Sequence, residues 1–216
     1  MAGLAERGHV RDDVRVVLPG GTAPPAAVPS QMFAAAADAY SAGRRLDMQS
    51  LARRLGVGRA TLYRRAGNRE DLLDEVIWWR ARRVVTLQLL LAGSQSGADR
   101  IAAVVGGVLR GIEADRPLRA FIQSDPDTAL RILTGSSVTA AGLTAALERL
   151  IDLERSRGCF DAGVDTSALA YAIMRISAGF FYADVFANRV PDSDRAVNVI
   201  RALLAGLDRT EPAEIQ

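Results

Sequence analysis

Hydrophobic positions recur at helical spacing along most of the chain, and no segment alternates apolar and polar residues as a half-buried β-strand would. The clearest stripe lies between residues 101 and 112, where apolar side chains follow the spacing i, i+3, i+4, i+7, i+8 and i+11. The pattern therefore predicts an all-α fold of about ten helices. They are expected within residues 30–43, 48–55, 59–65, 69–91, 101–112, 116–122, 126–135, 136–158, 166–188 and 193–207.

Capping residues mark several of the expected helix starts. Ser30, Asn68, Asp125 and Asp192 each stand where a side-chain oxygen can accept hydrogen bonds from the free N–H groups of a first turn. Asp125 is followed by Pro126, a residue that suits the first helical position. These signals predict where helices begin more sharply than periodicity alone does.

Two features allow two interpretations each. Gly106, Gly107 and Gly111 lie inside the clearest stripe. Each glycine lowers the stability of a helix by ~1 kcal/mol relative to alanine. Such a cost indicates either close helix contact or space for a ligand. The adjacent Trp78 and Trp79 can line the mouth of a ligand cavity or anchor a domain interface.

The segment 48–73, MQSLARRLGVGRATLYRRAGNREDLL, predicts two short helices joined by a glycine turn. The small Ala52 lets a second helix cross close to the first, and Gly56 ends the first helix where φ > 0 is needed. The second helix, 59–65, turns Leu62 inward and leaves its arginines outside. A helix-turn-helix of this kind presents its second helix to the major groove of DNA.

The run LARRLGVGRATLYRR, followed by a capped EDLL, resembles the DNA-binding domain of the TetR/AcrR family over residues 30–77. Gly58 departs from the family pattern, which usually has a Ser or Thr cap there, at a cost of about a few tenths of a kcal/mol. Ala66-Gly67 also departs, because an aromatic pair is usual at that point. The resemblance implies a TetR-like fold, with an N-terminal three-helix DNA-binding domain at 30–77 and a larger helical ligand-binding and dimerisation domain at 78–210.

By the same resemblance, the protein would be a ligand-responsive dimeric regulator, a repressor released by a small-molecule inducer. Its partner would be double-stranded DNA at a palindromic operator, since one short recognition helix reads only a few base pairs. The last two helices, 166–188 and 193–207, would form a homodimer by pairing with their copies. The alternative is that their apolar stripes close the subunit's own core.

The resemblance also selects the residues expected to contact DNA. Arg59 and either Arg64 or Arg65 would make bidentate contacts to guanine. Tyr63 would donate its hydroxyl to a phosphate, and the arginines outside the second helix would hold the backbone. The full set is Arg44, Arg45, Arg53, Arg59, Thr61, Tyr63, Arg64 and Arg65.

The charge distribution agrees with this assignment. Between Arg44 and Arg65 there are seven arginines and one acidic residue, Asp47, so this segment carries +6. The chain as a whole carries +2, so the remainder carries −4. All basic residues are arginine, which codon bias can explain, and phosphate contacts must therefore come from guanidinium groups.

Residues 1–29 are expected to be a disordered tail, because prolines and glycines recur from Pro19 to Pro29. A DNA minor-groove arm is the alternative. His9, the only histidine, lies in this tail. The N-terminus MAGLAERGH has no apolar core of a signal peptide, and Cys159 is the only cysteine, so a reducing cytoplasm is expected.

Eight residues of the larger domain are candidates for a ligand pocket. For each of them, core packing or helix capping is the alternative role and the more usual one. The candidates are Trp79, Phe121, Gln123, Asp125, Tyr171, Arg175, Phe180 and Tyr182. The stretch IQSDPDTALRILTG, with YRRAGNREDLL, resembles the TetR subgroup of the quorum-signal-degradation regulator. That subgroup is linked to lactone catabolism, so the resemblance implies a lactone-type inducer, to which nothing in the composition points.

Other function classes fit the sequence less well. An enzyme would need a poised nucleophile or base, and neither His9 nor Cys159 has a partner in sequence, so no catalytic residue, metal site or cofactor is expected. No apolar run approaches the ~18 residues of a membrane-spanning helix, so no membrane partner is expected. The remaining alternative is a helical small-molecule-binding or scaffold protein whose helix-turn-helix no longer binds DNA.

Overall fold

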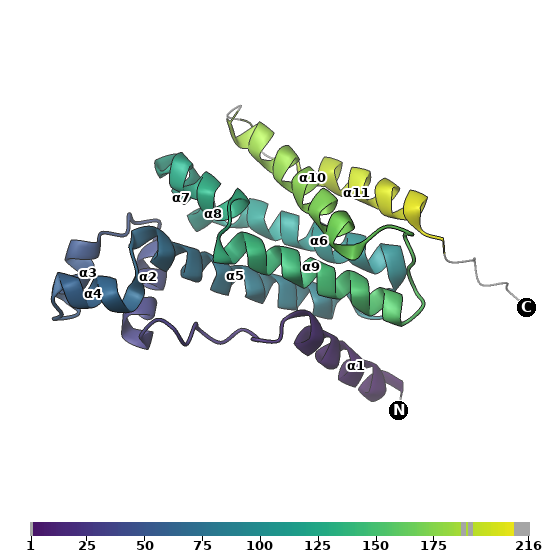
Figure 1. The fold of residues 1–216 in the computed structure, drawn as a ribbon, viewed down its shortest axis with the longest axis horizontal. Helices are drawn as coiled ribbons and strands as arrows, with labels where there is room; N and C mark the ends of the chain where they lie inside the picture. Colours follow the sequence, from purple (N-terminus) through teal and green to yellow (C-terminus); the bar gives the residue numbers. More distant parts are fainter. Residues whose placement is uncertain (1, 187–188, 190–191, 210–216) are drawn as a thin grey trace, which may run out of the picture. The chain divides into compact units, whose positions relative to one another are not determined.

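The computed structural model describes residues 2–186, 189 and 192–209, and the described residues form eleven helices and no strand (Figure 1). The predicted all-α fold is therefore confirmed, with one helix more than expected. The helices are α1 (Ala2–Val17), α2 (Ser30–Ser41), α3 (Met48–Arg54), α4 (Arg59–Ala66), α5 (Arg69–Ala92), α6 (Gly97–Ala114), α7 (Arg116–Ser124), α8 (Pro126–Thr134), α9 (Val138–Ser156), α10 (Thr166–Phe186) and α11 (Ser193–Leu207).

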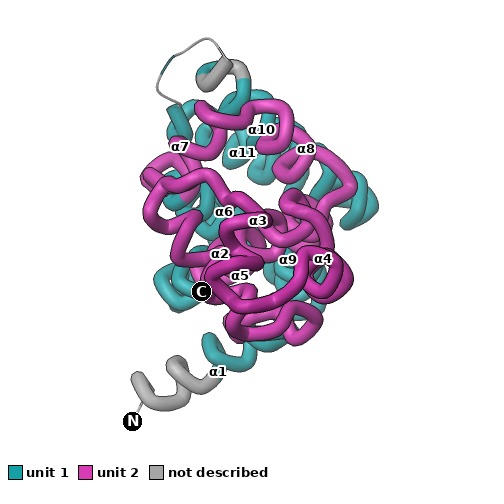
Figure 2. The backbone as a smooth tube through the Cα atoms, turned by 90° about the vertical axis from the view of Figure 1, so that its left-hand side faces the viewer, with its two compact units in different colours: residues 1–21, 84–111, 144–216 teal, residues 22–83, 112–143 magenta. Residues whose placement is uncertain are grey.

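The chain forms two compact units, coloured separately in Figure 2. Unit 1 comprises residues 1–21, 84–111 and 144–216, and unit 2 comprises residues 22–83 and 112–143. Their boundaries fall inside α5, α6 and α9, so each of these helices contributes residues to both units. The division expected at residue 77 lies within unit 2.

Unit 2 holds the helix-turn-helix. In it α2 packs against α3, α4 and α7, and α3 packs against α4. Leu62 of α4 and Leu72 of α5 are fully buried, and Ala52 of α3 is 3% exposed. Ala52 is therefore buried on the helix that packs against α4, which is compatible with the close crossing expected from its small side chain.

The turn between α3 and α4 has the geometry that its glycine predicts. Gly56 has φ +64°, in the left-handed region that glycine reaches without strain. The N–H of Gly56 donates to the Arg53 carbonyl and that of Val57 donates to the Ala52 carbonyl. Together these two bonds make a Schellman motif, which fixes the direction in which α4 leaves α3.

The start of α5 is capped as predicted. The Asn68 side-chain oxygen accepts hydrogen bonds from the N–H groups of Glu70 and Asp71, at 2.7 and 3.0 Å. The Asp71 carboxylate accepts the N–H of Asn68 in return, at 2.8 Å. The corresponding prediction for Ser30 is wrong, because α2 begins after Pro29 without a side-chain cap. Burial of the apolar face of α2, rather than a side-chain cap, stabilises this helix.

The start of α9 uses a cap that comes from far along the chain. The buried carboxylate of Asp74 accepts the N–H groups of Val138 and Thr139, at 2.7 and 2.9 Å. The Ser137 hydroxyl accepts the N–H of Ala140 at 2.9 Å. In unit 2, α5 is therefore joined to the beginning of α9 by charge-assisted hydrogen bonds.

The stretch Pro126–Ser156 contains an 18-residue window with a mean hydropathy of 1.2 and is, by length and composition only, long and apolar enough to cross a membrane. Such a stretch was not expected from the sequence. In the structure it is interrupted, since α8 ends at Thr134 and α9 begins at Val138. Core helices pass the same test of length and composition, and this single stretch is weak support for a membrane span.

The three glycines of α6 lie at close helix contacts, not at a space for a ligand. In unit 1, a Cβ atom on Gly106 would lie 3.0 Å from a Val197 methyl of α11. A Cβ on Gly107 would lie 2.0 Å from the side-chain oxygen of Gln88. The helix propensity lost at these positions is offset by the close approach of α5 and α11.

The expectation of a disordered tail at residues 1–29 is wrong, because residues 2–17 form α1. Val17 and Leu18 are buried, and the Asp13 carboxylate pairs with the buried Arg100 at 2.6 Å and with Arg157. Tertiary contacts therefore hold a helix whose own hydrophobic pattern is weak. The following residues lie along α5, where Trp79 Nε1 donates to the Thr22 carbonyl at 2.9 Å.

Candidate nucleic-acid interface

One side of α4 is buried and the other is exposed. Leu62 and Ala66 face the core of unit 2, and Gly58 begins the helix with no side-chain cap, as predicted. Tyr63 is 48% exposed, a large value for an aromatic side chain. The exposed residues of this helix are Arg59, Ala60, Tyr63, Arg64 and Arg65, with Thr61 half-buried. α4 thus presents arginines and a tyrosine hydroxyl, which are donors for phosphate and base edges.

Asp47 fixes the start of α3 beside this surface. Its carboxylate accepts the N–H groups of Gln49 and Ser50, at 3.1 and 3.0 Å, and the Ser50 hydroxyl. These hydrogen bonds, that from the Ser50 hydroxyl above all, hold the pKa of Asp47 below its ordinary value. The same hydroxyl accepts Nη2 of Arg53 at 3.0 Å, so the capping network also orients an arginine.

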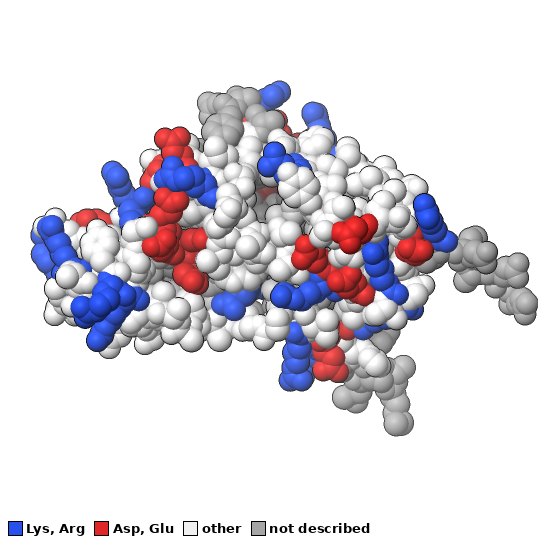
Figure 3. Space-filling model, in the orientation of Figure 1, with Lys and Arg blue, Asp and Glu red and all other residues white. Residues whose placement is uncertain are grey.

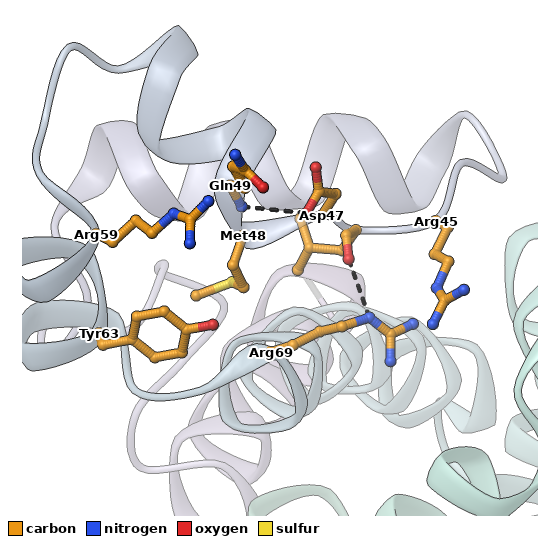
Figure 4. Close-up of a pocket in the computed structure, with 8 residues that line it drawn as sticks. Arg45, Asp47, Met48, Gln49, Arg59, Tyr63 and Arg69 are labelled. Atoms are coloured by element: carbon orange, nitrogen blue, oxygen red, sulfur yellow. Dashed lines mark hydrogen bonds between the residues drawn. The ribbon is translucent and has the colours of Figure 1, made fainter.

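A hollow of about 510 Å³ lies between the start of α3 and the exposed side of α4 (Figure 4). Figure 4 shows Arg59 and Tyr63 on one side and Arg45 on the other, with Met48 and Gln49 between them. Its lining is Arg45, Leu46, Asp47, Met48, Gln49, Arg59, Tyr63 and Arg69. Three guanidinium groups, a phenol and an amide face one acid that is already bonded, so the hollow suits an anion such as a phosphate.

The remaining DNA candidates also lie on this part of unit 2. Arg44 and Arg53 are exposed, and blue side chains gather over α3 and α4 in Figure 3. Arg54 lies 3.6 Å from the exposed Asp38 of α2. The structure therefore brings Arg45, Arg59 and Tyr63 together around the hollow. Of the other candidates, Arg44, Arg53, Arg64 and Arg65 are exposed and Thr61 is half-buried.

The ligand candidates of unit 2 have different surroundings. Trp79 lies edge-on to Phe33, with ring centroids 5.5 Å apart, and Arg83 lies over its ring. Phe121 is buried against the Tyr40 ring, with centroids 6.3 Å apart. Two further candidates complete the set: Gln123 is exposed, and Asp125 caps α8. Among these residues the structure shows packing and capping roles, and ligand contact stays a prediction.

The ligand candidates of unit 1 lie on α10. Tyr171 is 62% exposed, and the Arg175 guanidinium lies 6.0 Å from its ring centroid. Tyr182 packs edge-on to Phe181, and burial raises the pKa of its hydroxyl. Phe180 borders a cavity of about 10 Å³, too small for more than a water molecule. These four residues therefore do not line one described ligand pocket.

Five lining residues of the hollow were not among the candidates chosen from the sequence: Leu46, Asp47, Met48, Gln49 and Arg69. Gln49 carries no local signal, since an exposed glutamine in a first turn is ordinary. Arg69 was interpreted only as the first residue of a helix, because its partner Asp125 lies 56 residues away in the sequence. Elsewhere in the described part of the chain, no three metal-ligating side chains come together.

Two family models match the chain. The model of bacterial regulatory proteins of the TetR family matches residues 43–76, which include the α3 and α4 surface. The model of the tetracycline-repressor-like C-terminal domain matches residues 96–205, about half of the chain. Regulators of this family bind operator DNA as dimers and respond to small-molecule ligands.

Solved structures give the same result, whereas no curated protein matches the chain. The TetR-family transcriptional repressor QsdR of R. erythropolis is 29% identical over 84% of this chain and 95% of that chain, with a TM-score of 0.75. The fatty acid degradation regulator FadR of Bacillus halodurans is 20% identical over 84% and 96%, with a TM-score of 0.54, and supports the fold alone. The resemblance to the QsdR subgroup is consistent with these matches. The chain therefore belongs to the TetR family and is a transcriptional regulator rather than an enzyme.

Proposed function

We propose that this regulator is a homodimeric repressor that binds a palindromic operator through α4 and is released by a small molecule. The observation that carries the proposal is the exposed face of α4 beside the basic hollow. Arg64 and Arg65 would reach base edges, and the hollow lined by Arg45, Arg59 and Tyr63 would hold a backbone phosphate. The cytoplasm is where such a protein meets DNA.

The α10–α11 pair supports the dimer. These helices pack against each other in unit 1, and their exposed residues include small and apolar ones. Gly179 and Gly206 have no atom within 4 Å of the place that a Cβ would take, so backbone from another subunit can approach there. Tyr171 and Val199, 62% and 45% exposed, provide apolar area on the same two helices. The proposed interface is thus α10–α11 against its twofold copy.

The inducer class rests on resemblance alone. A lactone remains our first hypothesis, because the subgroup stretch on α7 and α8 suggests it. Any inducer must bind two states of the protein with different affinities, typically by ~1–3 kcal/mol, to release DNA. Release of operator DNA by acyl lactones of graded chain length therefore tests the hypothesis directly.

The experiment is fluorescence anisotropy of the full-length protein with a labelled DNA selected from a random pool, in a salt series with random competitor DNA. The test variant is Arg64→Ala with Arg65→Ala. Its matched control is Arg116→Ala with Arg119→Ala, which removes the same charge from two exposed positions on α7. A working recognition helix predicts that the test variant loses selective binding, at ~1–3 kcal/mol per guanine contact, while the control retains it.

Two outcomes would contradict the proposal. Equal losses in both variants would mean that bulk charge, not α4, gives the affinity. Recovery of no preferred sequence by the wild-type protein at any salt concentration would favour the alternative, a helical ligand-binding or scaffold protein whose helix-turn-helix does not bind DNA.

A further inference from the structure

Arg69, the first residue of α5, bonds to two segments of unit 2 that lie far apart in sequence. Its Nη1 donates to the Asp125 carboxylate at 2.6 Å. Its Nε donates to the Leu46 carbonyl at 3.0 Å, the bond drawn as a dashed line at Arg69 in Figure 4. The side chains of Arg69 and Asp125 are each 23% exposed, so water screens the pair only in part. One guanidinium group therefore holds the corner between α7 and α8 and the residue just before the α3 cap.

Both ends of this linkage are fixed by further contacts. At one end, Asp125 caps α8, its other oxygen accepting the Thr128 N–H at 3.4 Å. At the other end, Leu46 immediately precedes Asp47, whose carboxylate caps α3. Burial would raise the pKa of Asp125, but hydrogen bonds from Thr128 and Arg69 and the Arg69 charge lower it overall. Asp125 is therefore ionised at neutral pH, and the pair carries full charge.

A second ion pair lies beside the first. Glu70, the next residue of α5, accepts Nη2 of Arg131 of α8 at 2.9 Å. This pair is more exposed, with Arg131 57% exposed, and it bonds to no residue of the hollow. Arg69 differs because it lines the hollow itself. Of these two ion pairs, the Arg69 pair is therefore the one that connects the start of α8 to the surface that we assign to DNA.

We propose that Arg69 is a positioning residue that couples the α7–α8 corner to the DNA-facing hollow. A displacement of the α8 start would move Asp125, and the guanidinium would transmit it to the 44–49 segment, which carries Arg44, Arg45 and the α3 cap. The inference rests on the proposed function for its effect on DNA. It does not depend on that function for its effect on the 44–49 segment, which can be measured without DNA.

The test removes the pair while keeping the cap. In the full-length protein, Asp125→Asn keeps an oxygen for the Thr128 N–H, because asparagine caps helices as well as aspartate does. It also replaces the carboxylate that Arg69 binds by a neutral amide. The matched control is Asp127→Asn, which removes the same charge from an exposed position in the same helical turn. Arg69→Ala, alone and with Asp125→Asn, completes a double-mutant cycle.

Two readouts are taken on each variant: affinity for the selected DNA and hydrogen exchange of backbone amides in residues 44–51. We expect Asp125→Asn to weaken DNA binding about fivefold or more relative to Asp127→Asn, and to speed exchange in this segment. In the Arg69→Ala background, Asp125→Asn should add little to either effect. Circular dichroism checks that helix content is unchanged.

Several outcomes would overturn the coupling. One is that Asp125→Asn and Asp127→Asn change DNA affinity and hydrogen exchange equally. Another is that the effects of Asp125→Asn and Arg69→Ala are fully additive. A third is that Asp125→Asn speeds hydrogen exchange in residues 44–51 but leaves DNA affinity unchanged. If the wild-type protein selects no DNA, the proposed function fails, and exchange alone decides whether Asp125 positions the segment through Arg69. Unchanged exchange in Asp125→Asn would then reject the linkage itself.

Discussion

Arg100 and Glu154 form a salt bridge inside unit 1, with Nη1 of Arg100 2.8 Å from Oε1 of Glu154 and side chains that are 2% and 0% exposed. The second oxygen of Glu154 accepts the Gly97 N–H at 2.7 Å. The second terminal nitrogen of Arg100 donates to Asp13 of α1 at 2.6 Å. One arginine therefore connects three segments in an environment where an unpaired charge is costly.

Replacing Arg100 by methionine should strongly destabilise the protein. The substitution keeps apolar volume but removes the hydrogen-bonded cation of the buried Glu154, which keeps Arg157 at the longer distance of 3.7 Å, and this costs about 3–5 kcal/mol. Urea denaturation followed by circular dichroism measures the loss. The matched control is Arg110→Met, also on α6, whose pair with Asp194 is 3.3 Å long with side chains 54% and 76% exposed. The control should lose less than about 1 kcal/mol, and equal losses would show that the buried network adds no stability.

Acid should weaken the attachment of α1. Burial would raise the pKa of Asp13, but hydrogen bonds from Arg157 and Arg100 and their charges lower it below 3.8. When folding lowers the pKa of a carboxyl group, that group stabilises the folded protein at pH values above its pKa in the unfolded chain. This stabilisation is lost as the pH falls through the pKa that the group has in the folded protein. Wild-type stability should therefore exceed that of Asp13→Asn at pH 7, and the difference should shrink below about pH 4. Denaturation of both proteins across pH measures this difference, and a constant difference would rule out Asp13 titration.

Gly97 should tolerate alanine less well than Gly56 does. Both have positive φ, +59° and +64°, so alanine adds strain of about 1–2 kcal/mol at each. At Gly97 the new Cβ would also lie 2.2 Å from the backbone oxygen of Cys159, whereas at Gly56 it meets nothing within 4 Å. We expect Gly97→Ala to lose about 2–4 kcal/mol because overlap adds to strain. Denaturation of both variants at one protein concentration measures their free energies of unfolding. Similar losses would mean that the backbone at Cys159 moves away from the new Cβ at little cost.

Local signals were sufficient for the helix-turn-helix but not for what surrounds it. Gly56 and Asn68 act on residues within a few positions, so the turn and the start of α5 could be predicted from sequence. Asp74 caps α9 from 64 residues away, and α1 is held by a carboxylate, Asp13, that pairs with Arg100 87 residues later. No periodicity reports such contacts. The prolines and glycines that suggested disorder lie in the connection after α1. They therefore carry no information about the helix that precedes them.

The candidate site divides in the same way. Arg59 and Tyr63 could be chosen because the helical period and the family motif place them on the exposed side of α4. Arg69 could not, since its role depends on the pairing with Asp125. Asp125 was recognised as a cap, and its second interaction was invisible in the sequence. Local patterns thus identify a surface, while its connection to the rest of the unit requires coordinates.

Tyr63→Phe should weaken DNA binding modestly on every sequence. The hydroxyl borders the hollow, where it would donate a hydrogen bond to a phosphate oxygen, and a phosphate contact carries no sequence information. Loss of one such hydrogen bond at a solvent-exposed side chain costs about 0.5–1.5 kcal/mol. Anisotropy with the selected DNA and with random DNA measures both affinities. A change in preferred base, with total affinity kept, would show that Tyr63 reads a base edge instead.

Ala202→Glu should dissociate the dimer. Ala202 is exposed on α11 between Val199 and Gly206, which lie one turn away on either side at i−3 and i+4. In the proposed interface a carboxylate there would be buried without a partner, which costs about 3–5 kcal/mol and raises the dimer dissociation constant at least about 100-fold. Sedimentation equilibrium measures this constant, with Ala141→Glu on an exposed position of α9 as the control. Because a palindrome is read by two recognition helices at once, operator affinity should fall together with dimerisation. A variant that stays dimeric would place the interface elsewhere on the subunit.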